Sequence, residues 1–177
     1  MNFRRLFLGS LVCLCSASIN AAQSSPKNII MVIADGMGAH YPSAYRYYKH
    51  KVNDNQIKPT VFDQHLVGMV NTSPAQGSNF ITDSAAAATA FASGVKTYNG
   101  AIGLDNKKQP VVTVLEYAKS IGKNTGVVVT SDVIHATPAA YLSHTTSRKN
   151  KKDIADQYFD TRINQHFKMD VLFGGGR

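Results

Sequence analysis

Cysteine is scarce in this sequence: among 177 residues it occurs only as Cys13 and Cys15. Both lie in an N-terminal segment with the pattern of a secretory signal peptide, which we predict over residues 1–21. A chain that begins at residue 22 has no cysteine, which excludes disulfides and thiolate metal sites from it. Any metal ion that this chain binds must therefore be held by oxygen and imidazole nitrogen.

The signal-peptide pattern has a basic start, an apolar middle and a small-residue end. Arg4 and Arg5 come first, an apolar run covers residues 6–19, and Ala21 and Ala22 follow. The run is too short and wrongly flanked for a mature membrane span. A lipid anchor on one of the two cysteines is a minor alternative. No later segment is apolar enough to cross a bilayer, so we expect a periplasmic or secreted protein that is free of the membrane after cleavage.

Acidic residues are also few, because 11 Asp and Glu stand against 19 Lys and Arg, for a formal net charge of +8. Loss of Arg4 and Arg5 with the signal peptide lowers this charge from +8 to +6. A basic chain favours anionic ligands. The lysines are scattered, and we identify no basic helix interleaved with aromatic residues, so we do not expect nucleic acid as a partner.

The sequence has no internal repeat and no low-complexity linker, and strand patterns alternate with helix patterns. Strands are predicted over residues 29–34, 65–73, 124–132 and 169–177. Helices are predicted for the alanine-rich stretch after Thr82 and over residues 112–122 and 153–167. The first strand is continuously apolar, which is typical of a strand covered on both faces, and the third is predicted to be another such buried strand. This alternation predicts an α/β domain with a mostly parallel central sheet flanked by helices.

Asp35 follows the first predicted strand, where ligands of such sheets gather. As part of an Asp-Gly pair, taken alone, it is explained first by a turn. The functional alternative is a carboxylate ligand for a divalent cation.

Ser84 lies at the start of the alanine-rich helix. We expect Thr82, Asp83 or Ser84 to cap that helix, which is a common structural role. The free N–H groups of a helix N-terminus also favour an anion such as a phosphoryl group. No G-x-S-x-G elbow and no local base occurs beside Ser84, so activation of its hydroxyl by a metal is the economical alternative.

A third group follows the strand at 124–132. His135 and Thr137 are two residues apart, which in an extended loop sends both side chains to the same side, and Pro138 favours that conformation at Thr137. A polar loop is the alternative. Arg148 lies in a basic run that is ordinarily solvated, but its guanidinium can also bind two phosphate oxygens.

Taken together, these motifs resemble the alkaline phosphatase family, in the family's order and across nearly the whole chain after the signal peptide. The matching motifs are "ADGMG", "TDSAAAATAFASGVKTYNG", "HATPAAYLSHTTSR" and "DVLFGGGR". The resemblance identifies residues 22–177 as the amino-terminal part of an alkaline phosphatase-like catalytic domain. It implies metal-dependent hydrolysis of phosphate monoesters through a phosphoserine at Ser84, with Arg148 binding the non-bridging phosphate oxygens.

The resemblance also implies two kinds of metal cofactor, Zn²⁺ and Mg²⁺. Asp35 would bridge a zinc ion and the magnesium site, and the Ser84 alkoxide would be stabilised by zinc. His135 and Thr137 match the pair in the magnesium region, where the family has aspartate or histidine at the first position. With neutral imidazole there, we expect weaker magnesium occupancy and greater dependence of activity on added Mg²⁺. The family further implies a homodimer for the complete protein.

The family's remaining zinc ligands and the glutamate of its magnesium site come from a later part of the chain, beyond Arg177. If the 177-residue chain is the entire product, we expect it to be poorly stable and nearly inactive by itself. Its sheet would lack strands and expose apolar surface.

Two alternatives to the phosphatase stay open. One is a related phosphodiesterase of the same superfamily; a sulfatase fits less well because the C/S-x-P-x-R setting is missing around Ser84. The other is an exported, non-catalytic protein that binds phosphate or a metal through Ser84 and Asp35.

Overall fold

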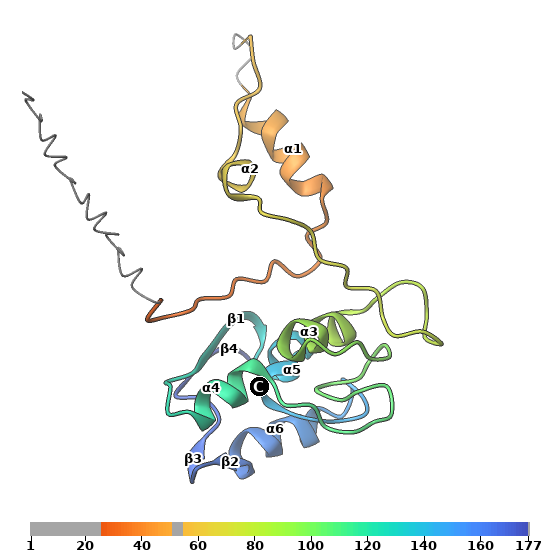
Figure 1. The fold of residues 1–177 in the computed structure, drawn as a ribbon, viewed down its shortest axis with the longest axis vertical. Coiled ribbons are helices and arrows are strands. Elements are labelled where there is room, and N and C mark those ends of the chain that lie inside the picture. Colours follow the sequence, from red (N-terminus) through yellow and green to blue (C-terminus); the bar gives the residue numbers. More distant parts are fainter. Residues whose placement is uncertain (1–25, 51–54, 177) are drawn as a thin grey trace, which may run out of the picture. The chain divides into compact units, whose positions relative to one another are not determined.

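The computed structural model in Figure 1 describes residues 26–50 and 55–176. The predicted signal peptide lies outside the described residues. The chain divides into two units, one ending at Ile33 and the other beginning at Ala34. The described residues of the first unit, 26–33, contain no helix or strand.

The second unit contains the helices and strands. Its helices are α1 (His40–Lys49), α2 (Val61–His65), α3 (Ser84–Ser93), α4 (Val114–Ser120), α5 (Ala136–Leu142) and α6 (Lys151–Asp160). Its strands are β1 (Gly126–Asp132), β2 (Arg162–Ile163), β3 (His166–Phe167) and β4 (Val171–Gly175). Within the described ranges, none of the helices has the length and apolar character that spanning a bilayer requires.

The main sheet is formed by β1 and β4, which run parallel with Gly126 opposite Val171 and Val128 opposite Phe173 (Figure 1). Helices α5 and α6 lie between these strands in the sequence, as a parallel connection requires. β2 and β3 form a separate antiparallel hairpin. The expected α/β fold with a parallel sheet and flanking helices is therefore confirmed.

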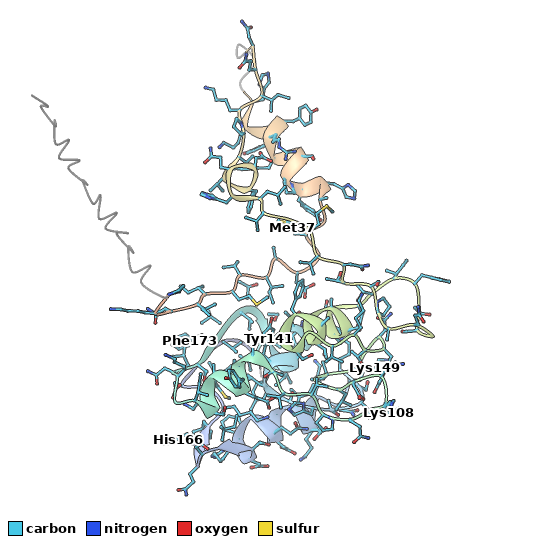
Figure 2. All side chains as sticks on the ribbon, in the orientation of Figure 1. Met37, Lys108, Tyr141, Lys149, His166 and Phe173 are labelled. Atoms are coloured by element: carbon cyan, nitrogen blue, oxygen red, sulfur yellow. The ribbon has the colours of Figure 1, made fainter. Side chains whose placement is uncertain are left out.

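Only one face of the β1–β4 pair is covered within the described part of the chain. Val127 and Leu172 pack against the hydrophobic core. On the other face Val128 is 70% exposed and Phe173, labelled in Figure 2, is 67% exposed. The prediction that residues 124–132 form a strand buried on both faces is wrong in this respect, because none of the described helices and strands covers the second face.

The core lies between the sheet and the helices. α3 and α5 lie side by side (Figure 1), and small residues at their interface, such as Ala85, Ala136 and Ala139, allow the close approach. The larger buried core residues are Ile102, Leu115, Leu142, Ile154, Tyr158 and Met169. Burial of each large aliphatic side chain stabilises the fold by about 1.5–3 kcal/mol.

Helix α3 confirms the predicted alanine-rich helix, and its two ends have clear chemical causes. The Asp83 side chain accepts a hydrogen bond from the N–H of Ala86 at 2.9 Å and caps the N-terminus. Gly94 ends the helix with a φ of +74°, which glycine adopts without steric cost. Five of the ten helical residues are buried, so the thin alanine face packs into the core.

The strands predicted over residues 29–34 and 65–73 are absent from the described structure. Ile29, Ile30 and Val32 are exposed and belong to no strand, and α2 covers Val61–His65 before exposed coil. Apolar runs form strands only when neighbouring strands complete the hydrogen-bond ladder. No described strand lies against these runs, so the prediction is wrong for this structure.

The two later helix predictions are correct in position but not in extent. α4 ends before Gly122, whose φ is +78°, as expected, but of the predicted apolar face Val114 and Ile121 remain half-exposed. The predicted helix over 153–167 ends at Asp160. Asn164 and Gln165 adopt positive φ values of 50° and 68° and form the turn of the β2–β3 hairpin instead.

The sequence analysis missed α1 altogether. This helix interleaves exposed tyrosines, among them Tyr45 and Tyr48, with Arg46 and Lys49, so the prediction of no basic helix interleaved with aromatic residues is wrong. Arg46 forms an ion pair with Asp63 of α2, and the Lys49 ammonium lies 5.4 Å from the centre of the Tyr45 ring. Both cations are thereby engaged within the chain.

Candidate active site

Three of the predicted site residues meet through hydrogen bonds. The Ser84 hydroxyl donates to Oδ1 of Asp35 at 3.0 Å, and the Thr137 hydroxyl donates to Oδ2 of the same carboxylate at 2.7 Å. Ser84 is the first residue of α3 and Thr137 the second residue of α5. Ser84 and Thr137 are 49 and 102 positions away from Asp35 in the sequence. The three side chains nevertheless form one oxygen-rich cluster, which is open to solvent.

The packing of α3 against α5 brings this cluster together. Ala85 and Ala139 are fully buried, so the two helices approach closely and their first residues lie near each other. The N-terminus of α3 carries free N–H groups and a partial positive charge. A carboxylate or phosphate beside Ser84 is stabilised by that charge.

The conformation at Thr137 differs from the prediction. We expected an extended loop at His135–Thr137, but only His135 is extended, with φ of −63° and ψ of 158°, and Thr137 is already helical. Pro138 does not prevent this, because it occupies the first turn of α5, where its missing N–H has no helical partner. His135 is therefore the N-cap residue of α5, and Thr137 lies in the first turn of that helix.

Arg148 lies beside the same helix terminus but contacts other partners. Its guanidinium donates to Oδ2 of Asp83 at 3.3 Å and to Nε2 of His135 at 3.2 Å. Since a guanidinium has no acceptor, the His135 nitrogen accepts this hydrogen bond. The Asp83 carboxylate also accepts the N–H groups of Ala86 and Gly100. Asp83 thus connects the cap of α3 to the arginine.

His135 is thus brought to Arg148, and its Nε2 is engaged there. The assignment of His135, Asp35, Thr137 and Ser84 as metal ligands stays a prediction. Within residues 26–50 and 55–176, no group of three or more His, Cys, Asp or Glu side chains is placed to hold a metal ion.

The chemistry of the donor set can nevertheless be compared with the expected ions. Asp35, Ser84 and Thr137 offer oxygen atoms alone, which suits a hard cation such as Mg²⁺. A tetrahedral zinc site requires further imidazole or carboxylate ligands. The described residues therefore fit part of a magnesium site better than a complete zinc site.

Sequence reasoning missed two features, one at this site and one outside it. It treated Asp83 only as a cap, although a carboxylate directly before Ser84 is also placed to pair with a nearby arginine. It also missed a buried ionic cluster of Glu116, His144 and Lys168. The only signal for Glu116 was the Thr-x-x-Glu pattern of a capping box, which the structure contains at Thr113.

The electrostatics of Glu116 show how strongly this cluster is held. Burial alone would raise the pKa of Glu116, but hydrogen bonds from His144, Lys168 and the N–H of Thr113 lower the pKa to about 2. The carboxylate is therefore ionised in the folded protein at neutral pH.

Comparison with known proteins decides the family. A family model described as alkaline phosphatase matches residues 26–177. The chain belongs to the alkaline phosphatase family. Alkaline phosphatase 3 of Bacillus subtilis (strain 168) is 53% identical to it over 155 residues, which is 88% of this chain and 34% of the relative.

Solved alkaline phosphatases agree in fold. The cold-active enzyme from the psychrophile Shewanella sp. gives a TM-score of 0.70 at 48% identity, over 81% of this chain and 34% of that chain. A TAB5 alkaline phosphatase variant, with one histidine replaced by glutamate and Mg bound in its M3 site, gives 0.56 at 37% identity over 62% of this chain and 29% of that chain. The chain thus spans about a third of the length of these alkaline phosphatases.

Proposed function

We propose that this chain contributes the nucleophile half of an active site that hydrolyses phosphate monoesters. The observation that carries the proposal is the hydrogen bond of 3.0 Å from the Ser84 hydroxyl to Asp35 at the N-terminus of α3. It orients the hydroxyl where free backbone N–H groups favour an arriving phosphoryl group. Membership of the alkaline phosphatase family supports the same reaction class.

The proposed reaction has two displacements at phosphorus. Oγ of Ser84 loses its proton and attacks, the bond between phosphorus and the ester oxygen breaks, and the alcohol leaves after taking up a proton. Water then attacks the phosphoserine, the bond to Ser84 Oγ breaks, and the hydroxyl is restored as inorganic phosphate departs. The two steps together consume one water molecule.

Arg148 has a binding role in this proposal. Its guanidinium presents N–H donors that suit two non-bridging phosphate oxygens, whose negative charge persists through the displacement. Asp83 holds the guanidinium through a contact of 3.3 Å, which does not depend on His135. This contact limits the freedom that Arg148 loses when phosphate binds.

We propose magnesium and zinc as the metal cofactors. Asp35 and Thr137, with His135 after its release from Arg148, would hold Mg²⁺, whereas Asp35 and Ser84 would contribute to a zinc site that needs further ligands. When bound, such ions supply positive charge that stabilises the Ser84 alkoxide. The magnesium named for the TAB5 variant supports a metal-dependent site. Export to the periplasm or medium and a homodimer remain predictions of the same kind.

The test combines this chain with the part of Bacillus subtilis alkaline phosphatase 3 that the match does not cover, produced separately. A chromogenic phosphate monoester is supplied with Zn²⁺ and Mg²⁺. We expect hydrolysis by the mixture and a phosphoserine at Ser84 after acid quenching. Ser84→Ala should abolish both signals.

Ser93→Ala is the matched control, because Ser93 lies at the other end of α3 and donates to the carbonyl of Thr89. It should leave hydrolysis unchanged. Hydrolysis that survives Ser84→Ala, or phosphate attached to another residue, would contradict the proposal. Binding of phosphate without hydrolysis in the presence of both metals would favour the non-catalytic alternative.

A further inference from the structure

A buried ionic cluster lies outside the candidate active site. Lys168, whose exposed fraction is 2%, donates from Nζ to Oε1 of Glu116 at 2.6 Å and to the carbonyl of Leu142 at 2.8 Å. Nε2 of His144 lies 2.8 Å from the same Oε1, and Nδ1 lies 2.7 Å from the carbonyl of Gly103. Glu116 thus joins α4, the end of α5 and the segment that leads into β4.

The residues after His144 lead directly to Arg148. Thr145 and Ile102 exchange backbone hydrogen bonds of 2.9 and 3.0 Å, and the N–H of Arg148 donates to the carbonyl of Gly100 at 2.7 Å. Segment 144–148 therefore lies along segment 100–103, with the His144 ring fixing one end and the Arg148 backbone the other.

The backbone at Gly103 lies close to the His144 ring. A Cβ atom on Gly103 would come within 2.7 Å of Nδ1 of His144 and 2.3 Å of the carbonyl oxygen of Ser143. The φ of Gly103 is +59°, which also favours glycine. The ring is therefore held between a close backbone on one side and a charged carboxylate on the other.

We propose that the Glu116–His144–Lys168 cluster positions Arg148 for phosphate binding. These three are positioning residues, since they act through the backbone of segment 144–148. That Arg148 binds phosphate rests on the proposed function. That the cluster positions Arg148 rests on the contacts of the fold. Loss of the Glu116 charge should release His144 and loosen Arg148.

A second ion pair in the protein provides a matched control. Oδ1 of Asp170 accepts from Nζ of Lys119 at 2.7 Å, and Oδ2 accepts the N–H of Thr125 at 2.8 Å. This pair joins α4 to the segment that leads into β4, as the Glu116–Lys168 pair does, without passing through His144. Asp170→Asn thus tests whether loss of any ion pair between α4 and the segment before β4 disturbs Arg148.

The first experiment measures amide hydrogen exchange in the full chain. Glu116→Gln should lower the protection of the Thr145 and Arg148 amides about tenfold relative to the amides of β1. Asp170→Asn should lower protection uniformly or leave it unchanged. If Glu116→Gln does not fold because Lys168 is left unpaired, the double variant Glu116→Gln/Lys168→Met removes both charges and serves instead. Equal loss at all amides, or the same local pattern in Asp170→Asn, would overturn the proposal.

The second experiment measures binding of inorganic phosphate in the presence of Mg²⁺. We expect Glu116→Gln to weaken binding about tenfold in the wild-type background and to have no effect in an Arg148→Ala background. An equal effect in both backgrounds would contradict action through Arg148. Absence of phosphate binding by the wild-type chain would count against the proposed function, and hydrogen exchange would then decide the positioning proposal alone.

Discussion

Helices α1 and α3 have ten residues each but form in different ways. α3 has a side-chain cap at Asp83, a glycine stop and five buried residues, whereas α1 has no side-chain cap and no buried residue. Packing into the core therefore stabilises α3, whereas α1 is stabilised only by its ion pair and by local interactions within the described chain. The difference shows that an apolar or helical pattern determines stability only where the fold supplies a surface to pack against.

The candidate active site draws on both kinds of region. Ser84 and Thr137 begin helices that pack into the core, but Asp35 follows an exposed segment and precedes α1. Asp35 is placed by the two hydroxyl groups that donate to it, not by a strand of its own. The residues after Asp83 form the packed region, and the residues up to Thr82 form the N-terminal region.

Removal of a core side chain should distinguish the two regions most strongly. Ile154 is fully buried on α6, so Ile154→Ala should lower the free energy of unfolding by about 2–5 kcal/mol. Ile30→Ala removes the same atoms from a side chain that is 88% exposed and should change it by less than about 0.5 kcal/mol. Urea denaturation measures both. Similar losses in the two variants would break the comparison.

The next largest difference should lie in the stability cost of replacing two glycines that have positive φ. Gly103→Ala combines left-handed strain with a clash against the Ser143 carbonyl and should cost about 2–4 kcal/mol. Gly77, in the N-terminal region, has a φ of +85° and no atom within 4 Å of an added Cβ, so Gly77→Ala should cost about 1 kcal/mol. Thermal unfolding can rank the pair, and the reverse order would contradict the close packing at Gly103.

Acid should weaken the packed region through Glu116. Its pKa is about 2 in the folded protein against an ordinary 4.5, so its stabilisation is complete above pH 4.5 and is lost as the pH falls toward 2. Linkage places the total at about 3 kcal/mol. Glu116→Gln should therefore flatten the dependence of unfolding on pH in that window.

The Arg46–Asp63 pair, whose side chains are 33% and 23% exposed, is the comparison for this acid effect. Its carboxylate also has a lowered pKa, chiefly through the hydrogen bond from Arg46, but water screens the pair. Asp63→Asn should have a smaller effect on acid unfolding, and one that added salt removes. A steeper loss with Asp63→Asn than with Glu116→Gln would show that burial does not set the strength of these pairs.

The smallest expected difference concerns two capping boxes of the same design. Thr113 caps α4 and Thr60 caps α2, each with its partner carboxylate three residues later. Thr113→Ala should cost about 1–2 kcal/mol because α4 packs on the core, and Thr60→Ala should cost less because α2 buries no residue. Urea unfolding followed by circular dichroism measures the pair. Equal costs would mean that α2 is as strongly coupled to folding as α4.

Elements of the fold could be predicted where neighbouring residues in the sequence determine them. The alanine-rich helix, the stop at Gly122 and the strands β1 and β4 followed from propensity and apolar patterning. The strand at residues 29–34 did not form, because its pattern requires neighbouring strands that the described chain lacks. The turn at Asn164 and Gln165 was missed because helical periodicity gives no signal of a positive φ.

The site was predictable as a set of residues but not as a geometry. The motifs singled out Asp35, Ser84 and Thr137, and the fold brings these three together. The sequence could not reveal that the nitrogen of His135 faces Arg148, because that contact depends on where α5 begins. The buried Glu116 cluster was also hidden, since its partners are 28 and 52 residues away in the sequence.

The most direct test of the proposed site is a titration with Mn²⁺, which shares the preference of Mg²⁺ for oxygen ligands, followed by amide relaxation in nuclear magnetic resonance. We predict that the amides of Gly36, Ala85 and Ala136 broaden first, that the β2–β3 hairpin is unaffected, and that Asp35→Asn abolishes the effect while Asp63→Asn does not. Broadening centred on another part of the chain, or broadening that persists in Asp35→Asn, would contradict a metal site at the Asp35, Ser84 and Thr137 oxygens.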